Sequence, residues 1–296
     1  MILLTGATGL AGLALARRFA AAGFPARLLT RDARRAVARL PNGPFELFEG
    51  DMGEPETYES ALRGVRRVLL CSSASPSMEN EQTTFIGACR SAGVEHVVKF
   101  SGGEIGFDPE RFAFTRMHER IEDALEASGL AWTHVRPSQF MQVYLREAPA
   151  IARTGELRLP NGAITLAPVD VEDIAEVLLR LLTEGGHEGE SLSMTGPEAL
   201  GMDRIAQEIS RVAEREVRYV PISPEARREG MLAAGAPAWF ADALLDQAHE
   251  RLRNPTAFVD LSTHERFGVA PTSFARFLDR EAAALRPAPT GPLLEA

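Results

Sequence analysis

Short apolar runs alternate with longer amphipathic stretches from the start of the chain to about residue 136. The runs expected to be strands are Ile2–Thr5, Ala26–Thr30, Phe45–Glu49, Arg67–Cys71, His96–Phe100 and Trp132–Arg136. The stretches between them that predict helices are Leu10–Ala22, Glu56–Leu62, Asn80–Ala92 and Arg111–Ser128. Alternating strands and helices indicate a parallel sheet, and near-continuous apolar strands are typical of a sheet covered on both faces. This part of the chain therefore predicts an α/β fold with a doubly wound parallel sheet.

Beyond Pro137 longer helices predominate. We expect these helices at Val171–Thr183, Met202–Glu214, Pro224–Ala233, Pro237–Arg253 and Ser273–Ala284. The strands expected here are Ala163–Ala167 and Ser191–Met194, and the Pro-rich tail Arg286–Ala296 is expected to be frayed. The pattern thus predicts a first domain over residues 1–150 and a smaller, mainly helical region over 151–296 that returns some strands to the sheet.

Composition narrows the class of protein. Apolar residues make up 45% of the 296 residues and charged residues 25%, as in ordinary globular domains. The formal net charge is −9 and the arginines are scattered, which disfavours nucleic-acid binding. Cys71 and Cys89 lie in or beside apolar stretches, so we expect buried free thiols in a reducing compartment and no metal site.

Membrane and export signals are not expected. The apolar runs are shorter than the ~20 residues that a membrane helix needs, and the first strand begins at about Ile2, without a charged and apolar leader before it. We therefore expect a cytoplasmic protein with no membrane partner.

The first strand is followed directly by Thr5-Gly6-Ala7-Thr8-Gly9-Leu10-Ala11-Gly12 and then by an apolar helix. A glycine at every third position allows a tight turn, then close approach of the backbone to a diphosphate, then close packing of helix on strand. The free N–H groups and positive dipole end of the helix hold the anion. Strand, turn and helix together predict a Rossmann dinucleotide site that involves Thr5, Gly6, Thr8, Gly9 and Leu10, with a purely structural turn as the alternative.

The end of the second strand bears on the choice of nicotinamide cofactor. A carboxylate there normally accepts from the adenosine ribose hydroxyls, whereas this chain has Arg31, followed by Asp32. A guanidinium can hold a 2′-phosphate, so we expect NADP(H) to be preferred over NAD(H). Arg31 as a plain surface charge is the alternative, and a shift of one residue would put Asp32 in its place.

Further cofactor contacts are expected where the third and fourth strands end. Asp51 and Met52 would meet the adenine, although Asp51 could equally cap the helix ahead of Pro55. Ser72 and Ser73 stand at the carboxyl edge of the sheet, where ligands of open α/β folds bind.

The chain resembles the NmrA-like group of atypical short-chain dehydrogenases/reductases from Met1 to about residue 285. The blocks that carry the resemblance are the glycine-rich turn, the stretch 118–142 with Ser128-Gly129-Leu130 and Val135-Arg136-Pro137, Val169-Asp170-Val171-Glu172-Asp173-Ile174-Ala175, and Met194-Thr195-Gly196-Pro197. The resemblance implies a Rossmann domain, NADP(H) binding and a small C-terminal region that closes over a cleft.

The segment Val98–Glu104 is also similar to isoflavone-reductase-like proteins. This similarity implies that Lys99 and Ser101 contact the cofactor and that Gly103 lies beside the substrate.

Short-chain reductases usually carry a Tyr and a Lys four residues apart on one helix, where both face the nicotinamide. In this chain Phe114 and His118 have that spacing. Phe114 cannot donate a proton, so we assign it to the substrate side and His118 to catalysis. An imidazole can bind ribose, orient a carbonyl or act as an acid near pH 7. A histidine that merely packs between helix and sheet is the alternative.

Further along the chain, Gln139, Phe140 and Tyr144 follow Arg136-Pro137 and are expected to bind substrate, with a core position as the alternative for the aromatic side chains. Asp170 and Asp173 begin a helix and are better explained by capping.

The leading functional hypothesis is an NADPH-dependent reductase that transfers hydride to a small quinone, imine, enone or azo acceptor, for instance in the tailoring of natural products. The loss of the usual tyrosine favours a rival, a catalytically silent NADP(H)-sensing regulator. A nicotinamide-dependent epimerase or isomerase is a third candidate. The apolar residues between Met231 and Leu245 either close the cleft or form a homodimer contact.

Overall fold

The computed structural model describes residues 1–102 and 113–286. Its central element is a seven-stranded sheet with the order β3-β2-β1-β4-β5-β6-β9, in which each neighbouring pair is parallel. The strands are β1 Ile2–Thr5, β2 Ala26–Thr30, β3 Phe45–Glu49, β4 Arg67–Leu70, β5 His96–Phe100, β6 Ala131–Pro137 and β9 Glu190–Met194. The expected α/β fold with a doubly wound parallel sheet is confirmed, and β9 is the strand that the later part of the chain returns to it.

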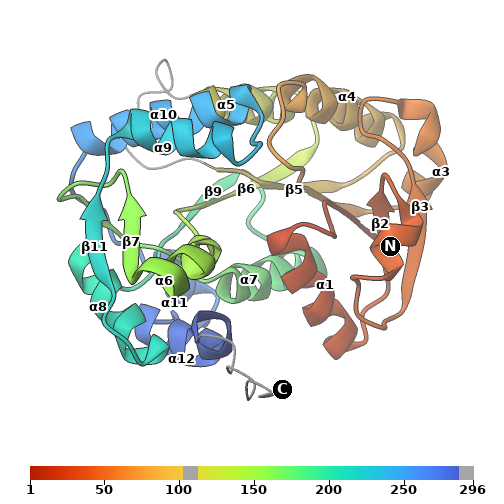
Figure 1. Ribbon diagram of the computed structural model, residues 1–296. Helices are drawn as coiled ribbons and strands as arrows, with labels where there is room; N and C mark the ends of the chain where they lie inside the picture. The colour runs from red at the N-terminus through yellow and green to blue at the C-terminus, as the bar shows by residue number, and fades with distance from the viewer. Residues whose placement is uncertain (103–112, 287–296) are drawn as a thin grey trace, which may run out of the picture. The chain divides into compact units, whose positions relative to one another are not determined.

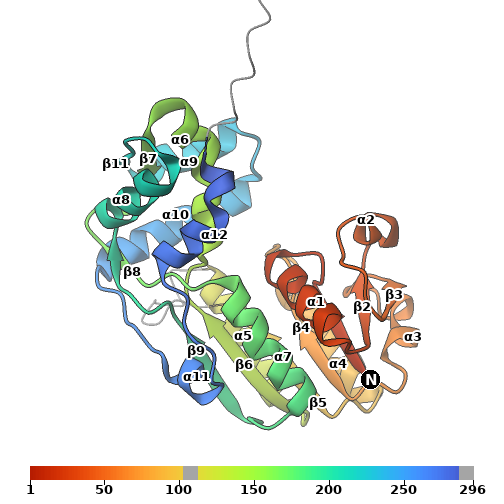
Figure 2. The ribbon, with the colours of Figure 1, turned by 90° about the horizontal axis from the view of Figure 1, so that it is seen from below.

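Helices cover both faces of this sheet (Figures 1 and 2). α1 (Leu10–Ala22) and α7 (Val171–Glu184) pack side by side on one face, and α4 (Met78–Ser91) and α5 (Ala113–Glu126) on the other. Shorter elements complete this part: α2 Ala33–Val37, η1 Pro55–Thr57, α3 Glu59–Leu62 and α11 Ser262–Arg266. The apolar strands therefore lose both faces to helices, as their composition requires.

Apolar packing holds α4 and α5 against the sheet. Phe85 of α4, Val97 of β5 and Ile121 of α5 belong to one cluster of fully buried side chains. Burying an aliphatic or aromatic side chain of this size contributes about 1.5–3 kcal/mol relative to exposure. This packing fixes the orientation of α5 and of the side chains on its inner face.

The chain divides into two compact units. Unit 1 contains residues 1–138, 171–194 and 260–270, and unit 2 contains 139–170, 195–259 and 271–296. The sequence predicted one domain boundary near residue 150, whereas the chain passes several times from one unit to the other. Sequence periodicity could not reveal this, because α7, β9 and α11 join the sheet through contacts distant in sequence.

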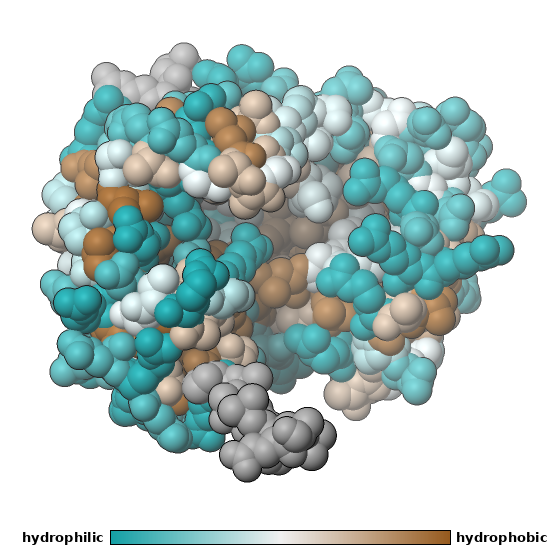
Figure 3. Space-filling view, viewed as in Figure 1, coloured by the Kyte–Doolittle hydropathy of each residue, from teal (hydrophilic) through white to brown (hydrophobic). Residues whose placement is uncertain are grey.

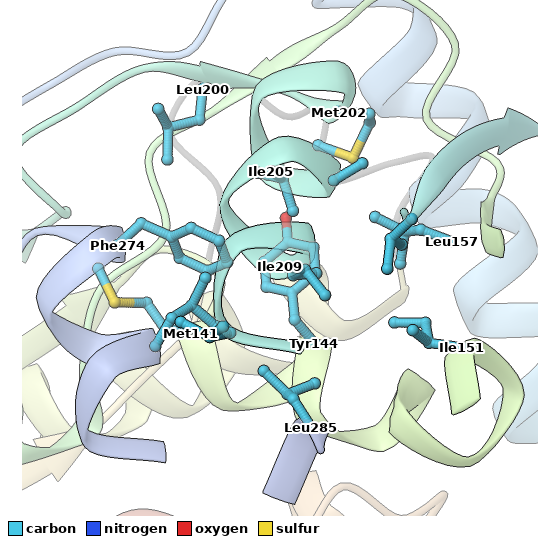
Figure 4. Close-up of a cluster of buried hydrophobic side chains, with 14 of the residues drawn as sticks. Met141, Tyr144, Ile151, Leu157, Leu200, Met202, Ile205, Ile209, Phe274 and Leu285 are labelled. Atoms are coloured by element: carbon cyan, nitrogen blue, oxygen red, sulfur yellow. The ribbon is translucent and has the colours of Figure 1, made fainter. Parts of the chain in front are cut away.

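Unit 2 is mainly helical, with two small sheets. Its helical elements are η2 Met141–Glu147, α6 Ala148–Thr154, α8 Met202–Ala213, α9 Pro224–Ala233, α10 Ala238–Arg253 and α12 Phe274–Leu285. Its strands form an antiparallel pair, β8 (Thr165–Leu166) with β10 (Leu200–Gly201), and a parallel pair, β7 (Glu156–Leu159) with β11 (Arg218–Pro221). Figure 4 shows its core, in which side chains of η2, α8 and α12 point toward one another.

The buried carboxylate of Asp170 makes a polar contact with the exposed Arg280 inside unit 2. Asp170 is completely buried and accepts hydrogen bonds from both terminal nitrogens of Arg280, at 2.7 and 3.2 Å, and from Gln142. The sequence suggested a helix-capping role for Asp170 and gave no hint of its distant partner.

The structure also bears on the expected lack of membrane helices and on the two cysteines. None of the helices in residues 1–102 and 113–286 is long and apolar enough to cross a membrane. Cys71 and Cys89 are free thiols, as expected, and burial raises the pKa of Cys71 to about 11 and of Cys89 to about 12.

Candidate functional site

The glycine-rich turn connects β1 to α1 at the carboxyl edge of the sheet, and two of its glycines have structural reasons to be there. Gly6 has φ +64°, and a Cβ on it would lie 2.7 Å from the Cys71 carbonyl oxygen. A Cβ on Gly12 would lie 2.1 Å from the Gly6 carbonyl oxygen. Side chains at both positions would therefore collide with the protein's own backbone.

Gly9 differs from these two glycines. An ideal Cβ on Gly9 meets only the Gly6 carbonyl oxygen, at 3.2 Å, and the residue is exposed. Gly9 is the N-cap of α1, without a side-chain cap and without an acidic residue in the first turn. The first N–H groups of the helix and its positive dipole end therefore have no capping side chain, which fits a diphosphate.

The side chains around the turn differ in their exposure. Leu10 is 42% exposed and Thr8 is half-buried, as a site at the mouth of a helix requires. Thr5 is completely buried, and its hydroxyl contacts the carbonyl oxygens of Leu69 and Cys71 and accepts from the Cys71 N–H. These hydrogen bonds join β1 to the end of β4, and contact of Thr5 with cofactor stays a prediction.

An exposed arginine follows the end of β2, and the carboxylates near it are hydrogen-bonded to backbone N–H groups. β2 ends at Thr30, so Arg31 follows directly, exposed and without an ion pair to any described residue. Asp32 caps α2 by accepting from the Arg35 N–H at 2.8 Å, and Glu49 accepts from the Ala33 N–H at 3.0 Å. Figure 3 shows the surface over β2 and β3 as largely hydrophilic. The end of β2 is at the predicted residue, so Arg31 and not Asp32 is the first residue after the strand.

Three of the residues predicted to contact cofactor after β3 and β4 make contacts within the protein. Asp51 accepts from the Gly53 N–H at 2.9 Å, and the N-cap of η1 is Glu54, so the alternative cap role of Asp51 is wrong in position. Met52 packs against the core beside α4. Ser72, half-buried, accepts from the buried Gln82, while Ser73 is exposed.

Lys99 and His118 form the central polar pair of the site. Lys99 lies on β5 and is completely buried, and its Nζ donates to the Phe100 carbonyl oxygen at 2.7 Å and to His118 Nδ1 at 3.1 Å. His118 comes from the inner face of α5 and is half-buried. Lys99 thus contacts His118, and its contact with cofactor stays a prediction.

Electrostatics and hydrogen bonding define the protonation state of His118. Burial and then the charge of Lys99 hold the pKa of His118 well below 6.5, so the imidazole is neutral. An ammonium group has no lone pair and can only donate, so Nδ1 must accept and Nε2 must carry the proton. Nε2 lies beside Gly102, because an ideal Cβ on that glycine would be 2.8 Å from it. The pair thus presents an N–H donor just past the end of β5.

A buried carboxylate lies one helical turn beyond His118. Glu122 is 3% exposed and pairs with Arg136 of β6 through two hydrogen bonds. Burial raises the pKa of Glu122, but the hydrogen bonds from Arg136 and the nearby positive charge outweigh it and lower the pKa. Ser101 is buried and its N–H donates to the Val135 carbonyl oxygen, which continues the β5–β6 ladder; its contact with cofactor stays a prediction.

The predicted substrate residues fall into different surroundings. Phe114 is half-buried on α5, four residues before His118, as expected. Tyr144 is completely buried in the core of unit 2, where it accepts from Gln139 and packs against Phe274, and its substrate contact stays a prediction (Figure 4). Gly103 lies outside the described residues.

Gln139 and Phe140 remain predictions as substrate residues. Both are half-buried and belong to unit 2. Phe140 is joined to Val169 by a parallel bridge.

Sequence reasoning missed the contact between Lys99 and His118 and the Glu122–Arg136 pair. One signal could have pointed to the first, since Lys99 is the only lysine among the 32 basic residues and interrupts an apolar strand. No comparable signal marks Glu122, because it is one of many acidic residues on helices.

Comparisons with known proteins bear on the family and the fold of this chain. The sequence profile described as the NmrA-like family matches residues 1–252. The NAD(P)H azoreductase of Xenophilus azovorans is 36% identical over 245 residues, which cover 82% of this chain and 85% of that protein. A (4-alkanoyl-5-oxo-2,5-dihydrofuran-3-yl)methyl phosphate reductase of Streptomyces griseus subsp. griseus is 33% identical over 287 residues, 97% of this chain and 100% of that protein.

A solved structure supports the fold. The NADPH-dependent quinone oxidoreductase of Escherichia coli in complex with NADPH superposes with a TM-score of 0.80 at 24% identity, over 95% of this chain and 99% of that one. The chain therefore belongs to the NmrA-like family.

Proposed function

We propose that this protein is an NADPH-dependent reductase of small conjugated or aromatic acceptors. The observation that carries the proposal is the occurrence of two features at the carboxyl edge of one sheet. These are the open helix mouth at Gly9 and the neutral His118 with its N–H donor. The relatives named as an azoreductase and a furanone phosphate reductase support reduction of a small molecule as the reaction class.

Bound NADPH would supply the hydride, and the protein's residues supply orientation and a proton. The N–H groups at the start of α1, next to Gly9, would hold the diphosphate. His118 Nε2–H would donate to an acceptor oxygen or nitrogen and so orient it. As negative charge develops on that atom during reduction, the same N–H would pass on its proton.

Preference for NADP(H) over NAD(H) belongs to this proposal. Arg31 is exposed and unpaired among the described residues, and the carboxylates of Asp32 and Glu49 are engaged at the start of α2. A 2′-phosphate would gain charge-assisted hydrogen bonds from Arg31, whereas the carboxylate that would accept from a 2′-hydroxyl serves as a cap. Substrate contact by Gln139 and Phe140, a reducing cytoplasmic location and a homodimer are further parts of this interpretation.

An acceptor panel tests the proposal. Purified protein is mixed with NADPH and with quinone, azo, imine and enone compounds, and the loss of nicotinamide absorbance is followed. We expect turnover with at least one class, and His118→Asn should lower kcat by about 10² or more, because general acid catalysis typically contributes that much. Absence of turnover across the panel, with NADPH bound, would reject the reductase.

The second candidate is an NADP(H)-sensing regulator, which the side chain of Phe114 favours. Phe114 occupies the place on α5 from which a tyrosine would donate a proton in short-chain reductases, and it cannot do so. A sensor would bind NADPH and NADP+ with different affinities and reduce none of the acceptors, so the same panel combined with calorimetry separates the two candidates.

A further inference from the structure

The chain retains a single lysine, although it has 32 basic residues in all. That lysine, Lys99, is completely buried at the carboxyl end of β5. A buried ammonium group is costly, and an arginine would supply the same positive charge. The two differ in one chemical respect, since a buried lysine can release its proton near neutral pH and an arginine cannot.

The surroundings of Lys99 couple it to His118. Nζ has one hydrogen bond to the Phe100 carbonyl oxygen and one to His118 Nδ1. The titratable groups that face it are Cys71 after β4, His118 and Glu122 on α5, and His134, which stands beside it in register on β6. His134 itself bonds Glu126 at 3.1 Å, so it is engaged elsewhere.

We propose that Lys99 is a positioning residue that fixes the Nε2–H form of His118 and supplies the imidazole with a replacement proton through Nδ1. This inference rests on the proposed reductase function, because only a reaction that consumes a proton needs a donor behind His118. It assigns to Lys99 a role that does not involve contact with substrate or cofactor.

The hydride and the proton reach the acceptor from different donors. Bound NADPH would supply the hydride and be oxidised, and the acceptor atom that becomes negative would take the Nε2 proton of His118. The Nε2–H bond breaks while a bond forms between Nδ1 and a proton from Lys99 Nζ, so the imidazole stays neutral and changes tautomer. Lys99 is left as a neutral amine. When a proton from solvent binds Nε2 and the Nδ1 proton returns to Nζ, both groups regain their starting forms.

The protonation energetics are consistent with this role. Burial, partly offset by the charges of Cys71 and Glu122, lowers the pKa of Lys99 to about 8. The group is therefore charged at pH 7 and yet releases its proton far more easily than an ordinary lysine does. Because the pKa of His118 is lowered well below 6.5, the imidazole does not hold a second proton: it gains one at Nδ1 only as it loses one at Nε2.

Nuclear magnetic resonance tests the pairing in the free protein, without turnover. Labelling with [13Cε]lysine gives one side-chain signal, since the chain has one lysine. We expect that signal to titrate near pH 8, and [15N]histidine spectra to show His118 protonated at Nε2. In Lys99→Met the His118 signal should shift toward a mixture of tautomers. A lysine signal that titrates near 10.5, or His118 protonated at Nδ1 in the wild type, would overturn the proposal.

Kinetics separates proton supply from positioning. Lys99→Arg keeps the charge and the donor but cannot release a proton, so we expect kcat at pH 7 to fall about tenfold or more with KM nearly unchanged. In the wild type kcat should decline above pH 8, and this limb should be absent from Lys99→Met. The control is His96→Asn, a buried histidine at the other end of β5, which should keep the wild-type pH profile.

The outcomes distinguish the two proposals. A wild type that reduces no acceptor refutes the reductase function and with it the need for proton supply. An active wild type whose kcat and pH profile are unchanged in Lys99→Arg and Lys99→Met refutes the role of Lys99 alone.

Discussion

Replacing Lys99 by methionine should make the folded protein more stable at neutral pH. Lys99 is completely buried, and its pKa of about 8 instead of 10.5 corresponds to about 3 kcal/mol against the charged folded state, at 1.36 kcal/mol per pKa unit. Methionine has a similar length and carries no charge. The variant loses two hydrogen bonds, worth about 1 kcal/mol each, so we expect a net gain of about 1 kcal/mol at pH 7.

The pH dependence gives a sharper test than the net value. The folded pKa of Lys99 is lowered, so the unfolded chain binds more protons than the folded one between pH 8 and 10.5. The penalty is complete below pH 8 and disappears as the pH rises through that range. Relative to Lys99→Met, the wild type should therefore gain about 2–3 kcal/mol between pH 7 and pH 10.

Urea denaturation followed by circular dichroism measures this difference at each pH. Subtracting the two proteins removes the contributions of groups that titrate alike in both. His96→Asn serves as the control, because the pKa of His96 is lowered from 6.5 by burial and its titration lies below this range. A difference between the wild type and Lys99→Met that stays constant from pH 7 to 10 would refute the reasoning.

Three further predictions concern the glycine turn, Arg31 and Asp170. Gly9→Val should remain folded by circular dichroism but weaken NADPH binding by about 10² or more in calorimetry, because its Cβ fills the open space at the mouth of α1; unchanged affinity would contradict the assigned site. Arg31→Ala should weaken NADPH binding about tenfold and leave NADH binding unchanged, and equal losses for both cofactors would argue against a 2′-phosphate contact. Asp170→Ala should lower the free energy of unfolding by about 2–3 kcal/mol, since it removes the buried partner of Arg280; a loss within ~0.5 kcal/mol would show that the pair is unimportant.

The regular elements of the sheet could be predicted from the sequence because local patterns encode them. Ile2–Thr5, Leu10–Ala22 and Ala26–Thr30 have the predicted bounds, since apolar runs and a C-terminal glycine mark them. The strands β7 and β11 were missed. Each has four residues, and they pair with one another across about sixty residues of chain, which no local pattern records.

The candidate site shows the same division. The glycine turn was found because spacing along the chain reflects its geometry. Contacts between elements could not be found in this way: Thr5 is tied to β4, Tyr144 is in the core, and Lys99 contacts a histidine nineteen residues away. Each depends on which face of a strand or helix meets a distant neighbour.

The repeated passage of the chain between the two units has a practical consequence. A fragment ending at residue 138 would lack α7 and β9, so β6 would become an open strand edge and α1 would lose the helix beside it. Unpaired edges and uncovered apolar helix faces promote aggregation. Each unit is made of three separate segments, so no single cut of the chain gives a fragment that contains one complete unit. We therefore expect isolated fragments to be insoluble, and each unit needs nearly the whole chain to be synthesised before it can fold.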